Sequence, residues 1–264
     1  QPSPPSLVKQ HFVSRFDNGV FVSVDFSQIE VVVFAQLCKD YTLINLLNEG
    51  KDIHIYIASQ ILNKPETEVT PEERSTAKTS TFGIIYGNGA KTLSERTGRD
   101  YMWCKTFMEQ FYKLFPMAKR WHEEIQKEVE LNGEITNFTG RTIFFKKYEA
   151  KYEWQVNKGI TESYNPPDIK NYPVQSLATG DIVPLMIGLL FRESMQYRDK
   201  FLLVNTVHDD IQFDCIEENV ELCKKVIKKV LDNTVEEIYN RWNIRFLVPI
   251  NYKIKIGKTL YDLT

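Results

Sequence analysis

Two acidic positions, far apart along this sequence, have the surroundings of ligands for a hard cation. Asp25 ends the β-branched, apolar segment GVFVSVD, which predicts a strand that holds the carboxylate at its end. Asp209 and Asp210 follow His208 between the strand-forming segments FLLVNTV and IQFDC, which together predict a β-hairpin. Carboxylates from separate strands can hold two divalent ions and so support an in-line phosphoryl displacement. Polymerases and nucleases share this pattern.

Each acid also has an ordinary structural explanation. Asp25 could simply precede a helix, and Ser27 with Glu30 has the Ser-x-x-Glu spacing of a capping box. Asp209 and Asp210 could form an exposed acidic turn. However, their apolar flanks predict a location near the core, where adjacent negative charges cost energy unless a cation neutralises them.

The segment RSTAKTSTFGIIYG adds a cationic and aromatic stripe. Thr-Pro-Glu-Glu, which begins at Thr70, predicts the start of a helix just before it. With about 3.6 residues per turn, positions four apart drift slowly around one face, which aligns Arg74, Lys78, Phe82 and Tyr86. Cations near a helix N-terminus suit phosphates, and aromatic rings suit a base or a sugar. An amphipathic helix with buried aromatics explains the spacing equally well.

We expect an α+β fold to position these residues: a small antiparallel sheet with a large helical insertion between its strands. The expected helices are 27–37, two within 41–62, then 70–86, 91–97, 100–114, 117–131, 174–196 and 217–240. A hairpin is expected at 133–147 and a last strand near 249–256, whereas 148–170 is expected to be irregular.

The composition is that of an ordinary soluble protein, with 264 residues, 42% hydrophobic and 26% charged. The net charge of −2 counts mildly against nucleic-acid binding, but nine basic and only three acidic residues lie between Arg74 and Arg120. No apolar run approaches the roughly 20 residues that span a bilayer, and no signal peptide is apparent. Four isolated cysteines predict reduced thiols in a cytoplasmic location.

Together these segments resemble the family A DNA polymerases, the DNA polymerase I family with its phage replicative relatives. VDFSQIE resembles motif A, RSTAKTSTFGIIYG fits motif B at every fixed position, and VHDD resembles motif C. GKDIH and NYPVQSLATGDI match intermediate segments in the family order, and the wording of several segments is phage-like. The resemblance covers essentially the whole chain. It implies a first part of the palm at 1–40, fingers at 41–132 and the remainder of the palm at 133–264.

The resemblance also implies site residues for DNA synthesis. Asp25 and Asp209, with the backbone carbonyl of Phe26, would bind two Mg²⁺ ions, for which Mn²⁺ could substitute. Lys78 would act with these acids in catalysis, and Asp210 would be a secondary acid.

Contacts with the substrates follow from the same resemblance. Lys78 and Arg74 would hold the incoming triphosphate, and Glu30 would exclude a ribose 2′-OH. Phe82 would pack on the sugar, which implies poor acceptance of dideoxynucleotides. Other nucleotide contacts would come from His54, Gln28 and Tyr86, the last beside the templating position. DNA contacts would come from Asn171, Gln175 and His208.

Three positions depart from the family pattern. Val32 stands where the family usually has Arg, and Asp210 is one methylene shorter than the usual Glu. An Arg common before Asn171 is absent, with Lys170 nearby as a substitute.

The matched motifs do not include the thumb, the palm elements that precede motif A in the family, or any exonuclease domain. We therefore expect a fragment or one subunit of a split polymerase. Its partners would be primer-template DNA, dNTP and a protein that supplies the thumb, with no membrane partner. Three alternatives stay open: a single-subunit RNA polymerase, which Glu30 disfavours; a two-metal nuclease, which leaves the stripe unexplained; and a catalytically incomplete DNA-binding or assembly subunit of a replication complex.

Overall fold

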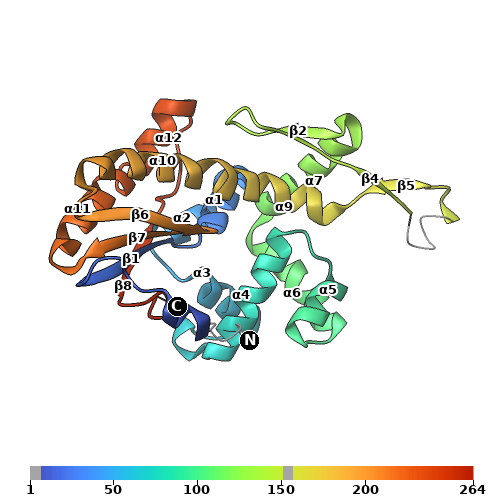
Figure 1. Cartoon of the computed structure of the whole chain (residues 1–264). Coiled ribbons are helices and arrows are strands. Elements are labelled where there is room, and N and C mark those ends of the chain that lie inside the picture. Colours follow the sequence, from blue (N-terminus) through green and yellow to red (C-terminus); the bar gives the residue numbers. More distant parts are fainter. Residues whose placement is uncertain (1–6, 151–156, 264) are drawn as a thin grey trace. The chain divides into compact units, whose positions relative to one another are not determined.

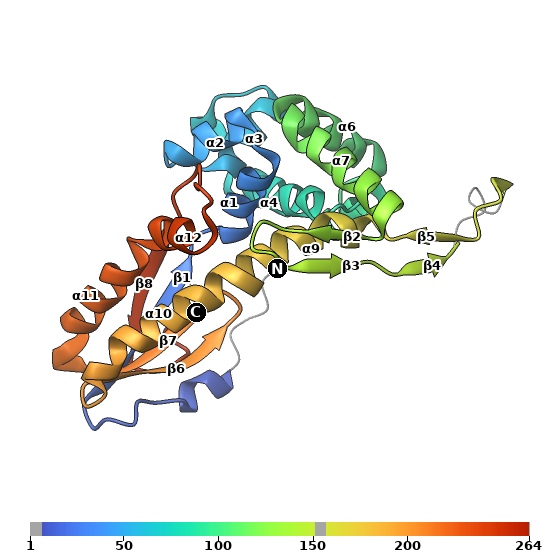
Figure 2. The same ribbon diagram turned by 90° about the horizontal axis from the view of Figure 1, so that it is seen from above.

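The computed structural model describes residues 7–150 and 157–263. The chain divides into two compact units, and each is described by itself. Unit 1 comprises Gln1–Ile29, Ala178–Phe246 and Ile250–Thr264, and unit 2 comprises Glu30–Leu177 and Leu247–Pro249. The elements are labelled in Figure 1 and seen from above in Figure 2. The predicted α+β fold, with a small antiparallel sheet and many helices, is confirmed.

Unit 1 is built on a four-stranded antiparallel sheet with the strand order β6-β7-β1-β8. Its strands are β1 (Gly19–Phe26), β6 (Phe201–Val207), β7 (Asp210–Ile216) and β8 (Tyr252–Gly257). Strand β1 is central, and it pairs Asp25 with Asp210 of β7 on one side and with Lys253 of β8 on the other. The sheet therefore joins three distant parts of the sequence around one acidic residue.

The two faces of this sheet differ because successive side chains in a strand point to opposite sides. Val22, Val24 and Phe213 lie on the apolar face and are fully buried. The helices α10 (Val183–Ser194) and α11 (Val220–Leu231) contact β6 and β7, respectively. The other face is polar, and the pairing register places on it Ser23, Asp25, Asp210, Gln212, Lys253 and Lys255.

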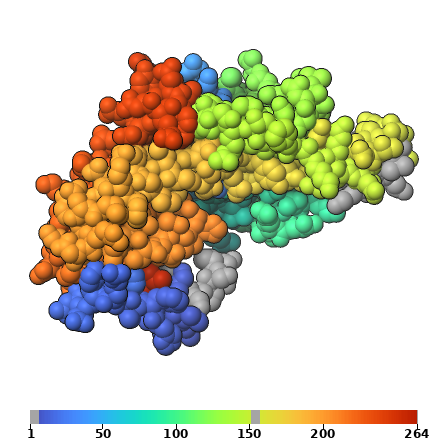
Figure 3. All heavy atoms as spheres, turned by 45° about the horizontal axis from the view of Figure 1, so that its top comes forward, coloured from blue at the N-terminus to red at the C-terminus, as the bar shows by residue number. Residues whose placement is uncertain are grey.

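The N-terminal segment of unit 1 lies against the far end of the polar face. Ser14 Oγ donates a hydrogen bond to Asp214 at 2.5 Å, and the Arg15 amide donates to the same carboxylate at 3.1 Å. The preceding 3₁₀ turn η1 (Leu7–His11) lies in the blue region of Figure 3 and has exposed apolar side chains.

Unit 1 also contains the short turns η4 (Met195–Tyr197) and η5 (Glu217–Asn219) and the helix α12 (Thr234–Trp242). The single helix predicted at 217–240 is wrong, because α11 ends at Leu231 and α12 begins at Thr234. The Thr234 hydroxyl donates to the Leu231 carbonyl at 2.6 Å, and Asn233 Nδ2 donates to the Lys229 carbonyl at 2.7 Å. Such bonds from side chain to backbone compete with the helical pattern and end the helix.

Unit 2 is mainly helical. Its helices are α1 (Ile29–Cys38, from Glu30 onward), α2 (Tyr41–Asn48), α3 (Ile53–Leu62), α4 (Pro71–Ile85), α5 (Ala90–Thr97), α6 (Tyr101–Leu114), α7 (Pro116–Asn132) and α9 (Pro166–Leu177), with the 3₁₀ turn η2 (Glu66–Glu68). Asp40, Asp52 and Asp100 cap the N-termini of α2, α3 and α6 with their carboxylates. The predicted capping box of Thr70 and Glu73 is present at α4.

Two short hairpins complete unit 2. The predicted hairpin at 133–147 is formed by β2 (Glu134–Thr136) and β3 (Thr142–Phe144). The prediction of irregular structure at 148–170 is wrong, because β4 (Lys147–Glu149) pairs with β5 (Glu162–Tyr164) and α9 begins at Pro166. Proline suits the first helical position, since its missing N–H is not needed there. Residues 151–156, within the same stretch, lie outside the described residues.

The helix predicted at 174–196 begins earlier and is interrupted. Helix α9 leads into a π-helical turn, η3 (Ala178–Ile182), before α10. Pro184 lies in the first turn of α10 and cannot donate a backbone hydrogen bond, which accounts for the break before it. By length and composition the stretch Pro166–Tyr197 could cross a membrane. A core helix of a soluble protein passes the same test, and Val174, Leu177, Met186 and Leu190 are fully buried here.

The units do not follow the boundaries expected for palm and fingers. Residues 133–177 belong to unit 2 together with 41–132, although the remainder of the palm was expected to start at 133. A compact unit is a geometric grouping, so the functional boundaries stay a prediction.

Candidate active site

Three aspartates meet at one end of the sheet in unit 1. Asp25 is directly opposite Asp210, and Asp209 is the neighbouring residue in the turn from β6 to β7. Directly paired residues of antiparallel strands have Cβ atoms about 4.5–5.5 Å apart. Asp209 is close enough for its charge to raise the pKa of Asp25, so the structure brings together two acids that are 184 residues (209 − 25) apart in the sequence.

The electrostatics of this acidic end favour a bound cation. Burial raises the pKa of Asp25, the charges of Asp209 and Asp210 raise it further, and Lys255 and Lys253 oppose them. Burial also raises the pKa of Asp209, opposed by its own backbone N–H and by His208. A divalent cation would relieve both carboxylates, and oxygen ligands are those that Mg²⁺ prefers.

The described residues contain no group of three or more His, Cys, Asp or Glu side chains arranged to hold a metal ion. A set of two carboxylates and the Phe26 carbonyl at the end of β1 would therefore leave the remaining positions to water or phosphate oxygens. Mg²⁺ is commonly bound in this way, because it dehydrates reluctantly and keeps several waters. The residues present fit the ion on these terms.

Asp210 differs from the other two acids. It was expected in the turn but is the first residue of β7, and only His208 and Asp209 separate the strands. Its carboxylate accepts hydrogen bonds from Ser23 Oγ and, at 2.5 Å, from Gln212 Nε2. Gln212 Oε1 in turn accepts from Asn205 Nδ2 at 3.0 Å. Asp210 is thus held within the sheet, and its role as a secondary acid stays a prediction.

Strained backbone flanks the acids. His208 has a φ of +57° and Gln28 a φ of +56°, a left-handed conformation that is uncommon for residues with a side chain. The Gln28 carbonyl oxygen Oε1 is buried without a hydrogen-bond partner among the described atoms. Helix α1 begins at Ile29, so Glu30 is its second residue and the capping-box explanation does not hold. Strain of this kind concentrates at functional sites.

The cationic and aromatic stripe is formed by α4 within unit 2. The rings of His54 and Phe82 are 5.7 Å apart between centroids, and those of Phe82 and Tyr86 are 6.0 Å apart. Arg74 Nε donates to Asp52 Oδ2 at 2.7 Å. Lys78 is exposed and makes no hydrogen bond or ion pair with the residues described.

His54 completes the stripe from α3. It is only 1% exposed, and neither ring nitrogen has a hydrogen-bond partner among the described atoms. Burial lowers its pKa to about 4; Asp52 opposes this shift, whereas Lys78 and Arg74 add to it. The imidazole is therefore uncharged at neutral pH, and its N–H can donate to an anionic ligand.

The glycines of this segment serve packing inside unit 2. A Cβ at Gly83 would lie 2.2 Å from Leu93 Cδ2, so α5 packs directly on the α4 backbone. Gly87 has a φ of +74°, and a Cβ there would lie 2.8 Å from Lys170 Cδ. Burial lowers the pKa of Lys170, whose side chain packs on the end of the α4 segment. Lys170 is thus partly enclosed by packing, and its service as a substitute for the missing family Arg stays a prediction.

The predicted DNA contacts lie in both units. Asn171 and Gln175 are four residues apart on α9 in unit 2, and therefore on one face of that helix. Asn171 Oδ1 is buried without a partner in the described part of the chain, and Gln175 is exposed. His208 lies in unit 1 beside Asp209. The roles of all these residues stay predictions.

Supporting residues escaped the sequence analysis. Asp52 caps α3 and holds Arg74, and its signal was an Asp directly before an apolar helix. Ser23 and Gln212 hold Asp210, and their signal was the alternation of polar residues along two buried strands. His122, which is 2% exposed, lies 3.0 Å from the Tyr112 hydroxyl through Nδ1. No sequence pattern pointed to His122, because a lone His in an amphipathic helix is not distinctive.

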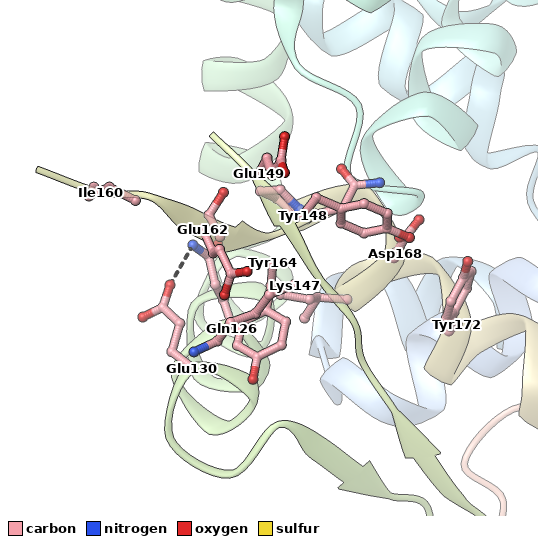
Figure 4. Close-up of a pocket in the computed structure, with 14 residues that line it drawn as sticks. Gln126, Glu130, Lys147, Tyr148, Glu149, Ile160, Glu162, Tyr164, Asp168 and Tyr172 are labelled. Carbon is pink, nitrogen blue, oxygen red and sulfur yellow. Dashed lines mark hydrogen bonds between the residues drawn. The ribbon is translucent and has the colours of Figure 1, made fainter. Parts of the chain in front are cut away.

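A cleft of about 710 Å³ in unit 2 is lined by none of the predicted site residues. Figure 4 shows it between α7, the start of α9 and the hairpin of β4 and β5. Glu130, Glu149, Glu162 and Asp168 line it, with Lys147 as the opposing charge. Its net negative lining makes it unsuitable for a nucleotide triphosphate.

Comparison with known proteins agrees with these motifs. The family model "DNA polymerase family A" matches residues 4–262. DNA polymerase I of Aquifex aeolicus is 34% identical over 220 residues, which cover 81% of this chain and 35% of that protein. The thermostable DNA polymerase I of Thermus aquaticus is 29% identical, with 95% of this chain and 28% of that protein covered. The DNA polymerase of Bacillus phage SP01 is also 29% identical, with 97% and 27% covered.

A solved structure shows the same fold. The POL domain of Pol1 from M. smegmatis, in complex with DNA primer-template and dNTP, has a TM-score of 0.80 at 22% identity. The match covers 97% of this chain and 42% of that one. The chain spans about a third or less of the length of these curated relatives. With the family model matching nearly every residue, the chain belongs to DNA polymerase family A.

Proposed function

We propose that this chain carries the nucleotidyl-transfer site of a template-directed DNA polymerase, which adds a dNTP to a primer 3′-OH. The observation that carries the proposal is that Asp25 lies directly opposite Asp210 at one end of the β1–β7 pair, with Asp209 next to it and close enough to interact electrostatically with Asp25. The α4 stripe supports it, because Lys78 is free to bind an anion and Arg74, His54 and Phe82 lie beside it.

Asp25 and Asp209, with the Phe26 carbonyl, would hold two Mg²⁺ ions. Such a pair, when bound, activates the attacking hydroxyl and stabilises the leaving oxygen. Asp210 keeps the turn in place through Ser23 and Gln212.

The residues of α4 and its neighbours would bind the incoming nucleotide. Lys78 would neutralise the triphosphate and stabilise charge that develops on it. Arg74, oriented by Asp52, would add a fixed cation. The neutral imidazole of His54 would donate to a phosphate oxygen, which would satisfy a nitrogen that is otherwise unpaired.

Other assignments follow the family motifs. Phe82 would pack on the sugar and Tyr86 beside the template base, with Gln28 near them. Glu30 would exclude ribonucleotides. Asn171, Gln175 and His208 would contact the template or primer.

The proposal includes a protein partner with polymerase elements outside the matched third of the relatives. It also includes a cytoplasmic location, which the four buried free cysteines support. Adding the partner should raise the rate of extension without removing the need for Asp209.

Primer extension tests the function. The wild-type chain, with and without the partner, should extend a labelled primer with dNTP and Mg²⁺, and Asp209→Ala should abolish extension. Glu221→Ala, in an exposed ion pair on α11, is the matched control for loss of a carboxylate. DNA binding without extension in any arm would favour a non-catalytic DNA-binding subunit instead. Equal use of rNTP would contradict the role of Glu30.

A further inference from the structure

The polar face of the unit 1 sheet extends past the acids onto β8. Lys253 is directly opposite Asp25, and Lys255 is directly opposite Ser23. Directly paired residues of antiparallel strands share a face of the sheet. The face is therefore divided, with the acids towards β7 and two lysines towards β8.

The two lysines are not equivalent. Lys255 Nζ donates to the Leu263 carbonyl at 2.8 Å, so it holds the C-terminal turn. Lys258, further along the chain, forms an ion pair with Glu217 at 2.7 Å. Lys253 is exposed and has no hydrogen bond or ion pair with any residue that the structure describes, Asp25 included.

We propose that Lys253 is a positioning residue that binds a backbone phosphate of the primer strand, next to the acids that hold the metal ions. The inference rests on the proposed function, because only a polymerase site would bring a primer terminus to this face. A lysine suits this task, since its ammonium is a point charge on a flexible four-carbon stem that reaches a phosphate without fixed geometry.

The primer is favoured over the incoming nucleotide by the division of charge between the units. The triphosphate already has Lys78, Arg74 and His54 in unit 2. The primer 3′-OH has no such cations behind it and must reach the acids of unit 1, so the phosphates just behind it would pass over the polar face of this sheet. An unpaired cation beside Asp25 is placed to hold one of them.

Equilibrium binding of a fluorescent primer–template, measured by anisotropy without dNTP at 50–200 mM salt, tests the inference. Removing one phosphate contact should reduce the slope of log K against log salt by about 1. When the salt concentration rises from 50 to 200 mM, the affinity of Lys253→Ala should therefore fall by a factor that is about 3.5 times smaller than the factor for the wild type. Lys253→Arg should keep the wild-type slope, and Lys258→Ala is the matched control that should leave it unchanged.

The outcomes separate the inference from the proposed function. An unchanged slope and affinity in Lys253→Ala, with normal primer extension by the wild type, would overturn the inference alone. A raised KM for dNTP with an unchanged slope would also overturn it, because Lys253 would then serve the triphosphate. Absence of Mg²⁺-dependent extension by the wild type, with and without the partner, would overturn the proposed function and the inference with it. Melting temperatures of the variants should stay within about 2 °C of the wild type, since substitutions at exposed positions change stability little.

Discussion

Asp52 both caps helix α3 and holds Arg74 of the proposed nucleotide site, and substitutions can separate these two roles. Its Oδ1 accepts from the backbone amides of His54 and Ile55, and its Oδ2 accepts from Arg74. Loss of an N-cap costs about 1 kcal/mol. The ion pair is partly exposed, at 29% for Asp52 and 40% for Arg74, so it adds roughly 0.2–1 kcal/mol. Asp52→Ala should therefore destabilise the protein by about 1–2 kcal/mol.

Asn caps a helix as well as Asp does, but it carries no charge. Asp52→Asn should therefore keep most of the stability while it releases Arg74. A loss of 1 kcal/mol lowers Tm by roughly 2–4 °C in a protein of this size. Calorimetry at pH 7 should show a fall of about 2–8 °C for Asp52→Ala and a smaller fall for Asp52→Asn. Both variants should raise the KM for dNTP, because Arg74 loses its orienting partner.

The effect of pH provides a second check. Burial raises the pKa of Asp52, but the hydrogen bonds and charge of Arg74 and the capping amides outweigh it, so the net pKa lies below the ordinary 3.8. A lowered folded pKa stabilises the fold above 3.8, and this stability is lost as pH falls through the folded value. Asp52→Asn should lack this loss. If Asp52→Asn melted as low as Asp52→Ala at pH 7, the capping argument would be refuted.

Three further predictions concern other parts of the chain. Burial raises the pKa of Asp209, so its charged form destabilises the fold once pH rises through the raised value. Asp209→Asn should therefore raise Tm at pH 7 in EDTA while it abolishes extension, and a lower Tm would contradict this. Burial lowers the pKa of His122 to about 3, so stability should fall by up to about 1.4 kcal/mol per pH unit below 6.5, and urea titrations of His122→Gln should show a shallower fall. Gly83→Ala places a methyl 2.2 Å from Leu93 Cδ2 and should lower the stability of the fold by about 1–3 kcal/mol. Adding Leu93→Val should restore part of this stability, and no recovery in the double variant would mean that the clash is not the cause.

The sequence predicted those elements whose local signals agree with their tertiary setting. The α4 helix begins and ends within a residue of its prediction, because the cap, the proline and the glycines all act locally. Asp25 pairs with Asp210, which is far away in the sequence, yet the apolar strands beside both acids predicted that they would lie close together. The fold class followed from the order of these elements.

Other features depend on partners that a single segment does not reveal. The β4–β5 pairing joins residues either side of a long connection, and neither three-residue strand has a clear alternation of its own. The end of α11 depends on hydrogen bonds from Asn233 and Thr234, residues that are also common within helices. The binding of Asp210 by Ser23 and Gln212 required the register of the sheet, which sets the facing residues.

The path of the chain between the units affects how the protein can be dissected. Unit 2 is not one continuous segment, because Leu247–Pro249 belongs to it although the flanking residues belong to unit 1. Leu247 fastens this short strap: its amide donates to Gln36 Oε1 at 2.8 Å, and its carbonyl accepts from Asn48 Nδ2 at 3.1 Å. A recombinant piece covering only 30–177 would lack both of these hydrogen bonds, each of which contributes about 0.5–1.5 kcal/mol in a typical protein. Isolating unit 2 with all of its parts therefore requires a circular permutant that includes Leu247–Pro249, or a separate peptide that supplies this strap.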